Sequence, residues 1–170
     1  MSSQLIDGID IFDSERIKEL IRNNEFVKSK TILLQVLNII ESYALETGEG
    51  VTSGYYEKLF TVYNKLKDKK SAKNILLRYL IQPKARGKSA RKIYERYLKL
   101  NPTLDESAVQ KDIYDKYLAN LDKTNLIGTR IECEHCHKLG IYLLPKNYIH
   151  GSMFIAICPF CFEETLVGLK

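Results

Sequence analysis

Two Cys-x-x-Cys pairs near the C-terminal end of the sequence constrain its fold most strongly. Cys133-Glu-His-Cys136 and Cys158-Pro-Phe-Cys161 are separated by 21 residues and contain all four cysteines of the chain. A two-residue gap lets both thiolates of a tight turn reach one ion, and a spacer of roughly 15–20 residues is typical of four-cysteine zinc sites. We therefore predict that Cys133, Cys136, Cys158 and Cys161 bind one Zn²⁺ ion per chain.

Two other interpretations of the cysteines fit the sequence less well. Redox-active Cys-x-x-Cys pairs lie at a strand–helix junction in a βαβ setting, and no such pattern surrounds these pairs. A catalytic coordination position would be open on the metal if His135, His137 or His150 replaced one thiolate as ligand. Four available thiolates favour a closed structural site, in which metal binding and folding of the segment are one process.

The segment between the pairs contains two short apolar runs, residues 141–144 and 153–157, which we expect to form a β-hairpin. With the four cysteines, it resembles a zinc ribbon, a module of RNA polymerase subunits, general transcription factors and some ribosomal and viral proteins. The resemblance covers roughly residues 130–165 and implies the same four ligands. Transcript-cleavage ribbons carry an Asp-Glu pair at the hairpin tip. Residues 147–151 contain no acidic residue, so that activity is not expected.

The preceding residues show apolar side chains at helical spacing from Asp13 to about Leu121. The pattern predicts six helices, which start near Asp13 or Ser14, Val27, Ser53, Ser71, Ser89, and Asp105 or Ser107. Three of them carry Ile and Tyr four residues apart, which indicates a shared way of packing. The fold class is therefore mainly α, with an N-terminal helical bundle at residues 1–125 and a small C-terminal β-hairpin zinc ribbon at residues 126–170.

This combination of helices with a cysteine-pair ribbon is similar in architecture to late transcription factors of large DNA viruses. Beyond the four cysteines the similarity concerns architecture alone. The Lys-, Ile-, Asn- and Tyr-rich composition is compatible with a viral source.

Positive charge is concentrated in residues 65–99. That segment holds 13 of the 26 Lys and Arg residues and only two acidic residues, while the whole chain has a net charge of +5. Such a cluster favours a phosphate backbone as partner, and the excess of 19 Lys over seven Arg argues against specific reading of bases. The predicted nucleic-acid-binding residues are Lys84, Arg86, Lys88, Arg91 and Lys92. The alternative is a solvated helical face that keeps the protein soluble.

No enzyme signature is found, because the sequence has no Gly-rich phosphate loop, no Gly-x-Ser-x-Gly and no His-Glu-x-x-His. No apolar run reaches membrane-span length and the N-terminus has no secretory pattern, so we expect a cytoplasmic, nuclear or viral protein. The predicted function is a non-enzymatic zinc protein associated with nucleic acid, acting in transcription or with RNA polymerase or another large complex. A structural or adaptor subunit is the alternative, and a metal-dependent nuclease is the least favoured.

Overall fold

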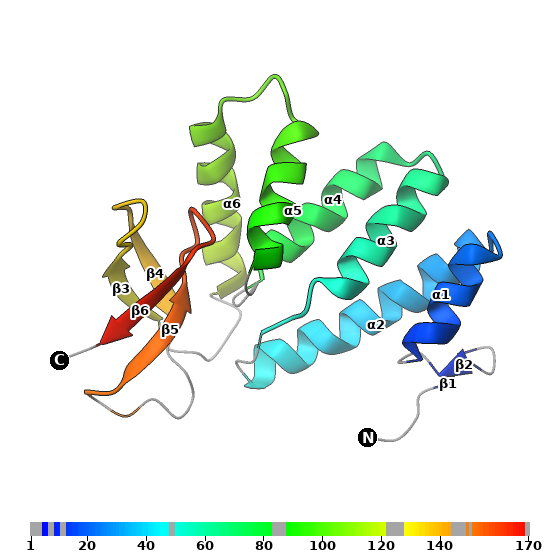
Figure 1. The fold of residues 1–170 in the computed structure, drawn as a ribbon, viewed down its shortest axis with the longest axis horizontal. Helices are drawn as coiled ribbons and strands as arrows, with labels where there is room; N and C mark the ends of the chain where they lie inside the picture. Colours follow the sequence, from blue (N-terminus) through cyan, green and yellow to red (C-terminus); the bar gives the residue numbers. More distant parts are fainter. Residues whose placement is uncertain are drawn as a thin grey trace.

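The protein is mainly α-helical, with two small antiparallel strand pairs at its C-terminal end (Figure 1). The structure is a computed structural model and describes residues 5–6, 9–10, 13–47, 50–82, 88–121, 128–143, 149 and 151–168. A short pair of strands, β1 (Leu5–Ile6) and β2 (Ile9–Asp10), precedes the helices. The helices are α1 (Ser14–Arg22), α2 (Phe26–Thr47), α3 (Gly54–Lys65), α4 (Lys69–Leu80), α5 (Lys88–Lys99) and α6 (Glu106–Leu121). The predicted fold class is confirmed.

Aspartate side chains determine where several helices begin. Asp13 caps α1 by accepting hydrogen bonds from two amides of its first turn, and Asp105 does the same before α6. The prediction that α4 begins at Ser71 was wrong. Asp68 caps this helix by accepting a hydrogen bond from the Ser71 amide at 2.9 Å, so α4 begins two residues earlier. Ser89, which was expected to cap α5, is instead the second residue of this helix, which begins at Lys88.

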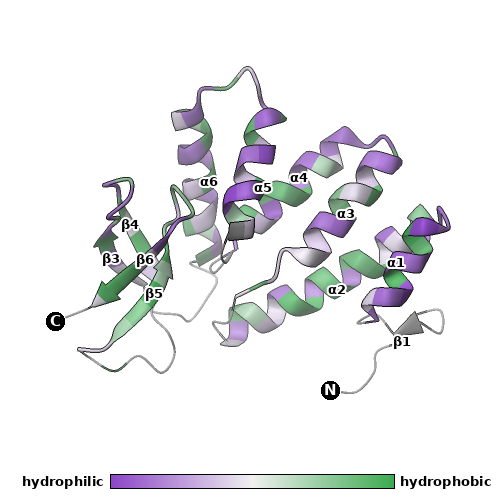
Figure 2. Ribbon diagram, in the orientation of Figure 1, coloured by the Kyte–Doolittle hydropathy of each residue, from purple (hydrophilic) through white to green (hydrophobic). Residues whose placement is uncertain are grey.

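Consecutive helices from α1 to α5 pack side by side in chain order (Figure 1). The repeated Ile and Tyr positions of the last three helices all face inward. These buried pairs are Ile75 and Tyr79, Ile93 and Tyr97, and Ile113 and Tyr117. The shared packing that this spacing predicts is confirmed. Figure 2 shows hydrophilic and hydrophobic segments alternating along α4, α5 and α6.

One ion pair within the bundle ties three helices together. Arg78 of α4 donates from Nε to Glu41 of α2 at 2.8 Å, and the Tyr56 hydroxyl of α3 donates to the same carboxylate at 2.6 Å. Burial and the nearby carboxylate raise the pKa of Tyr56, so its hydroxyl remains a donor. Arg78 belongs to the basic segment at residues 65–99, but its guanidinium group holds helices of the bundle together.

The C-terminal residues form two hairpins instead of the one that was expected. β3 (Gly128–Glu132) pairs with β4 (Leu139–Leu143), and β5 (Met153–Ile157) pairs with β6 (Glu164–Gly168), both antiparallel. A C-terminal β-hairpin module is thus confirmed. The predicted pairing of residues 141–144 with residues 153–157 was wrong, because each of these strands pairs across its own cysteine turn. The domain boundary at residue 125 lies outside the described residues and stays a prediction.

Candidate metal centre

The two cysteine pairs occupy equivalent turns at the tips of the two hairpins. Cys133 donates its amide to the Lys138 carbonyl at 3.1 Å, and Cys158 donates its amide to the Glu163 carbonyl at 3.0 Å. In each turn the residue after the second cysteine donates back to the carbonyl of the first cysteine, at 2.8 and 3.0 Å. The two turns therefore have the same backbone design.

The residues that follow the second cysteines adopt the left-handed conformation that favours glycine. His137 has a φ of 55° and Phe162 a φ of 60°. This conformation costs an L-residue roughly 1–2 kcal/mol. Earlier in each turn a backbone amide donates to the first sulfur. The His135 amide donates to Cys133 Sγ and the Phe160 amide donates to Cys158 Sγ, both at 3.4 Å. The two turns thus share their backbone strain as well as their N–H···S hydrogen bonds.

The four sulfur atoms form one compact cluster. All lie within 4.8 Å of one another, with Cys133 and Cys161 Sγ 3.7 Å apart and Cys136 and Cys158 Sγ 3.6 Å apart. All four cysteines are free thiols. Four thiolates at about 2.3 Å from a tetrahedral Zn²⁺ would be about 3.8 Å apart along each edge. The cluster is therefore close in size to a tetrahedral four-thiolate metal site. It fits a divalent ion that prefers tetrahedral coordination by sulfur.

A close approach between the hairpins allows the two turns to meet. Gly140 of β4 faces the second turn. A Cβ atom there would lie 3.0 Å from Cγ of Pro159 and 3.1 Å from Cε2 of Phe160. Such distances are shorter than ordinary van der Waals contacts, so a side chain at this position would push the turns apart. Glycine at residue 140 thus helps to bring the second pair of sulfurs to the first.

The thiols differ in how easily they ionise. At Cys133 burial opposes ionisation. The hydrogen bonds from the Cys136 and His135 amides and from the Thr165 hydroxyl outweigh burial and lower the pKa to about 6. Burial raises the pKa of Cys136, and burial together with Cys158 raises the pKa of Cys161. Without a cation the sulfurs therefore compete for negative charge, and a divalent ion would stabilise all four as thiolates.

The nearby histidines lie outside the sulfur cluster. His135 Nε2 is 2.9 Å from the Glu164 carbonyl oxygen, and His137 Nδ1 is 3.7 Å from the Glu132 carboxylate. His150 lies outside the described residues. Among the described His, Cys, Asp and Glu residues, the four cysteines form the one cluster that could hold a metal ion.

The first hairpin docks on α6 through two tyrosines. The Tyr117 hydroxyl donates to the Ile141 carbonyl oxygen at 3.1 Å, and the Tyr114 hydroxyl accepts from the Ile141 amide at 3.2 Å. Both backbone groups of this β4 residue are thereby satisfied by one helix. An otherwise open strand edge is covered by the bundle.

The second cysteine turn inserts an aromatic side chain into the bundle core. Phe162 is only 5% exposed and belongs to the main helical core, where its ring centroid lies 5.1 Å from that of Tyr94. Phe160 contacts Tyr114 of α6 at a centroid distance of 4.3 Å. Arg91 of α5 donates to the Cys161 carbonyl oxygen at 3.3 Å. The cysteine cluster is therefore joined to α5 and α6 by packing and by hydrogen bonds.

The predicted nucleic-acid-binding residues are only partly placed by the structure. Lys84 and Arg86 lie outside the described residues, and Lys88 is the first residue of α5. Arg91 pairs with Glu95 at 3.1 Å as well as with Cys161. Lys92 is exposed. The set is thus not gathered at one described site, and Arg91 faces the cysteine turn.

Sequence reasoning missed three residues that shape the centre. Phe162 fixes the second turn to the bundle, while Thr165 and Tyr142 place hydroxyl groups beside the sulfurs. Thr165 and Tyr142 lie in short strands where successive side chains point to opposite faces. Nothing in the neighbouring sequence indicates that they pack with cysteines of the other hairpin. No signal in the sequence could have distinguished them from ordinary core residues.

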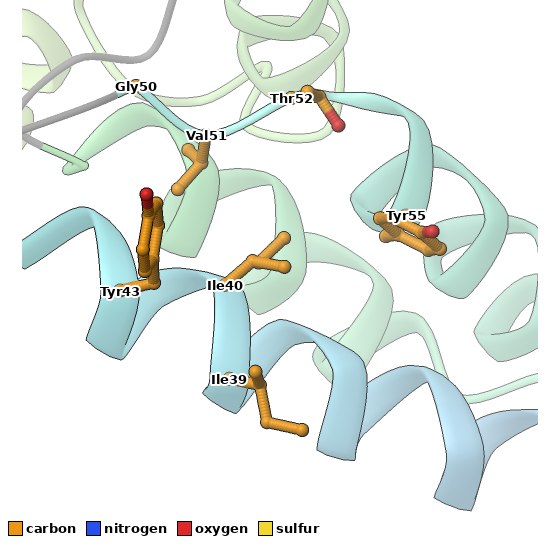
Figure 3. Close-up of a pocket in the computed structure, with 7 residues that line it drawn as sticks. All are labelled: Ile39, Ile40, Tyr43, Gly50, Val51, Thr52 and Tyr55. Atoms are coloured by element: carbon orange, nitrogen blue, oxygen red, sulfur yellow. The ribbon is translucent and has the colours of Figure 1, made fainter. Parts of the chain in front are cut away.

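A pocket of about 190 Å³ lies elsewhere, between α2 and the segment that leads into α3 (Figure 3). Its lining is mostly apolar and includes Ile39, Ile40, Tyr43, Val51 and Tyr55. The lining residues that the structure describes supply no carboxylate, thiol or basic group.

Within the described residues, none of the helices is both long and apolar enough to cross a membrane. No protein-family model, curated protein or solved structure matches this chain. The four-cysteine cluster, which fits a site of the zinc-ribbon kind, is therefore the main guide to function.

Proposed function

We propose that this protein is a non-enzymatic, zinc-binding accessory protein that associates with nucleic acid in transcription or with a polymerase. The observation that carries the proposal is the direct docking of the four-cysteine cluster on α5, a helix of the basic segment at residues 65–99. Metal binding would fix the second cysteine turn, and this turn supports the helix that offers positive charge. The ion would have a structural role.

Zinc is the ion that the donor set favours. Four thiolates in a tetrahedral cluster match its preference for sulfur and leave no open position for catalysis. The amides of His135 and Phe160 add donors to an anionic site. These features support a closed, structural zinc site.

Several basic side chains lie on the surface where α3, α4 and α5 meet. Lys73 of α4 lies over the Tyr97 ring at 5.8 Å, and Arg96 of α5 lies over the Phe60 ring at 5.2 Å. Within the described part of the chain, Arg78 and Arg91 are the members of residues 65–99 that form ion pairs. We name Lys73, Lys92, Arg96 and Lys99 the basic face. Its largely uncompensated charge supports binding to phosphates.

The alternative is a structural or adaptor subunit that uses the basic face to dock an acidic protein. The second hairpin favours this candidate, because Met153, Ile155 and Leu166 are 56–66% exposed. Ile155 and Leu166 are direct cross-strand neighbours. An exposed apolar pair of this kind is typical of a protein contact.

Metal analysis tests the first part of the proposal. The purified protein is expected to contain one zinc ion per chain, and replacing Cys133 and Cys158 by Ser is expected to abolish it. One iron ion per chain would assign the site to another metal. Full-length protein without any bound metal would refute the zinc assignment.

Binding of the zinc-loaded protein to labelled DNA and RNA, from about 50 to 200 mM salt, tests the second part. About five phosphate contacts predict a slope of log affinity against log salt of roughly −3.5 to −4.5. Lys92→Glu with Lys99→Glu should weaken binding strongly. Lys18→Glu with Lys116→Glu changes the net charge equally on α1 and α6, so it serves as the control. Equal effects of the two pairs, or no binding at the lowest salt, would favour the adaptor function.

A further inference from the structure

A buried hydroxyl group without a partner lies beside the cysteine cluster. Tyr142 of β4 is 1% exposed and packs in the same small core as Cys133 and Cys158. Among the described residues, no group hydrogen-bonds its hydroxyl oxygen. A buried hydroxyl that forms no hydrogen bond is unfavourable, so this position requires an explanation.

Cysteines of both turns pack in the same small core as this tyrosine, Cys133 from the first turn and Cys158 from the second. A tyrosine phenol is protonated at neutral pH. A protonated phenol can donate a hydrogen bond, but a neutral thiol is a weak acceptor. A thiolate is a much better acceptor because it carries charge.

Thr165 provides a counterpart on the other hairpin. Its Oγ1 atom lies 3.7 Å from Cys133 Sγ, and the residue is 4% exposed. Thr165 comes from β6 of the second hairpin, whereas Cys133 belongs to the first. Tyr142 provides the reverse link, because it comes from β4 of the first hairpin and shares a buried cluster with Cys158 in the turn of the second.

We propose that Tyr142 is a positioning residue of the metal centre that donates an O–H···S hydrogen bond to the Cys158 thiolate. Thr165 does the same for Cys133. This inference rests on the proposed metal binding, because bound metal keeps both sulfurs ionised. The two hydroxyls then link the hairpins reciprocally and reduce the excess negative charge of a four-thiolate site. They therefore strengthen metal binding and slow its release.

Replacing Tyr142 by Phe removes the hydroxyl and retains the ring. We expect the zinc dissociation constant, measured by chelator competition, to rise about 10-fold or more. Zinc release should accelerate accordingly. In the Co²⁺-substituted protein, the sulfur-to-cobalt charge-transfer bands should shift, because the electron density on Cys158 changes.

Tyr56→Phe is the matched control. It also removes a buried tyrosine hydroxyl, but one that donates to Glu41 in the helical bundle. This variant should lower the unfolding midpoint with unchanged zinc affinity and an unchanged cobalt spectrum. Thr165→Val tests the counterpart without a large change of volume and should weaken zinc binding in the same direction as Tyr142→Phe.

The outcomes separate this inference from the metal assignment. If wild-type protein binds one zinc ion tightly and Tyr142→Phe has the same affinity and cobalt spectrum, the role of Tyr142 is refuted and the zinc site stands. If wild-type protein binds no metal, both fail. Equal losses of zinc affinity in Tyr142→Phe and Tyr56→Phe would show that Tyr142 acts only through the stability of the fold. Its specific role at the metal centre would then be refuted.

Discussion

Arg91 of α5 donates a hydrogen bond from Nη1 to the backbone carbonyl oxygen of Cys161, at 3.3 Å and across 70 positions of the sequence. Its Nε atom pairs with Glu95 at 3.1 Å. A residue predicted to bind phosphate therefore also holds the second cysteine turn on the helix. Lys92, the next residue, is exposed and belongs to the basic face.

This contact predicts different effects for two neighbouring substitutions. Arg91→Ala should lower the free energy of unfolding by about 1 kcal/mol, because a partly exposed charged hydrogen bond to the cysteine turn is lost. Lys92→Ala should change it by less than about 0.5 kcal/mol. Urea denaturation of the zinc-loaded protein measures both. A larger effect of Lys92→Ala on stability would contradict the docking role of Arg91.

The two strained residues of the cysteine turns predict opposite effects. Phe162→Ala should destabilise the protein by about 3–5 kcal/mol, because it empties an aromatic site in the main core. His137→Gly should stabilise it by about 1 kcal/mol, because glycine accepts the left-handed φ and the histidine is exposed. Thermal unfolding tests the pair, and destabilisation by His137→Gly would mean that its side chain has an unrecognised role.

Loss of the metal should lower the stability of the helices without unfolding them. Cys158→Ser or a strong chelator is expected to unfold the two hairpins, since so small a module depends on its ion. The helical circular dichroism signal should largely remain. The unfolding midpoint of the helices should fall, because Phe162 and Tyr114 lose their contacts. An unchanged midpoint would show that the bundle does not depend on the docked turn, whereas complete loss of helix would refute an independently stable bundle.

Metal affinity should depend on pH in two stages. The pKa values of Cys136 and Cys161 are raised, so binding at neutral pH must displace their protons. The pKa of Cys133 is lowered to about 6, so this thiol becomes a further proton competitor only below that pH. Zinc affinity should therefore fall on acidification and fall more steeply below about pH 6. Competition titrations over this range measure the slope, and a pH-independent affinity would contradict a thiolate site.

The helical part of the fold was largely predictable from the sequence. Ile and Tyr four residues apart lie on one helical face, and all three such pairs are buried as expected. The exact starts of α4 and α5 were not predictable. Several residues there can serve as caps, and Asp68 was selected over Ser71 by its place in the folded turn.

The strand pairing illustrates what a local pattern leaves undecided. Residues 141–144 and 153–157 were correctly identified as β-forming, but each could pair with a strand on either side. The cysteine turns settled this choice, because their hydrogen bonds reverse the chain directly between β3 and β4 and between β5 and β6.

The sequence by itself determined the set of four cysteines that could hold a metal ion, because a two-residue spacing brings both cysteines of each pair to one side of a turn. It also determined the helical faces and the concentration of positive charge, which depend on residues close together in the chain. Only the tertiary structure decided that Arg91 and Phe162 join the cysteine cluster to α5, and that Tyr142 and Thr165 pack with cysteines of the opposite hairpin. These contacts connect segments far apart in sequence, and their geometry is fixed by the packing of the hairpins against the bundle.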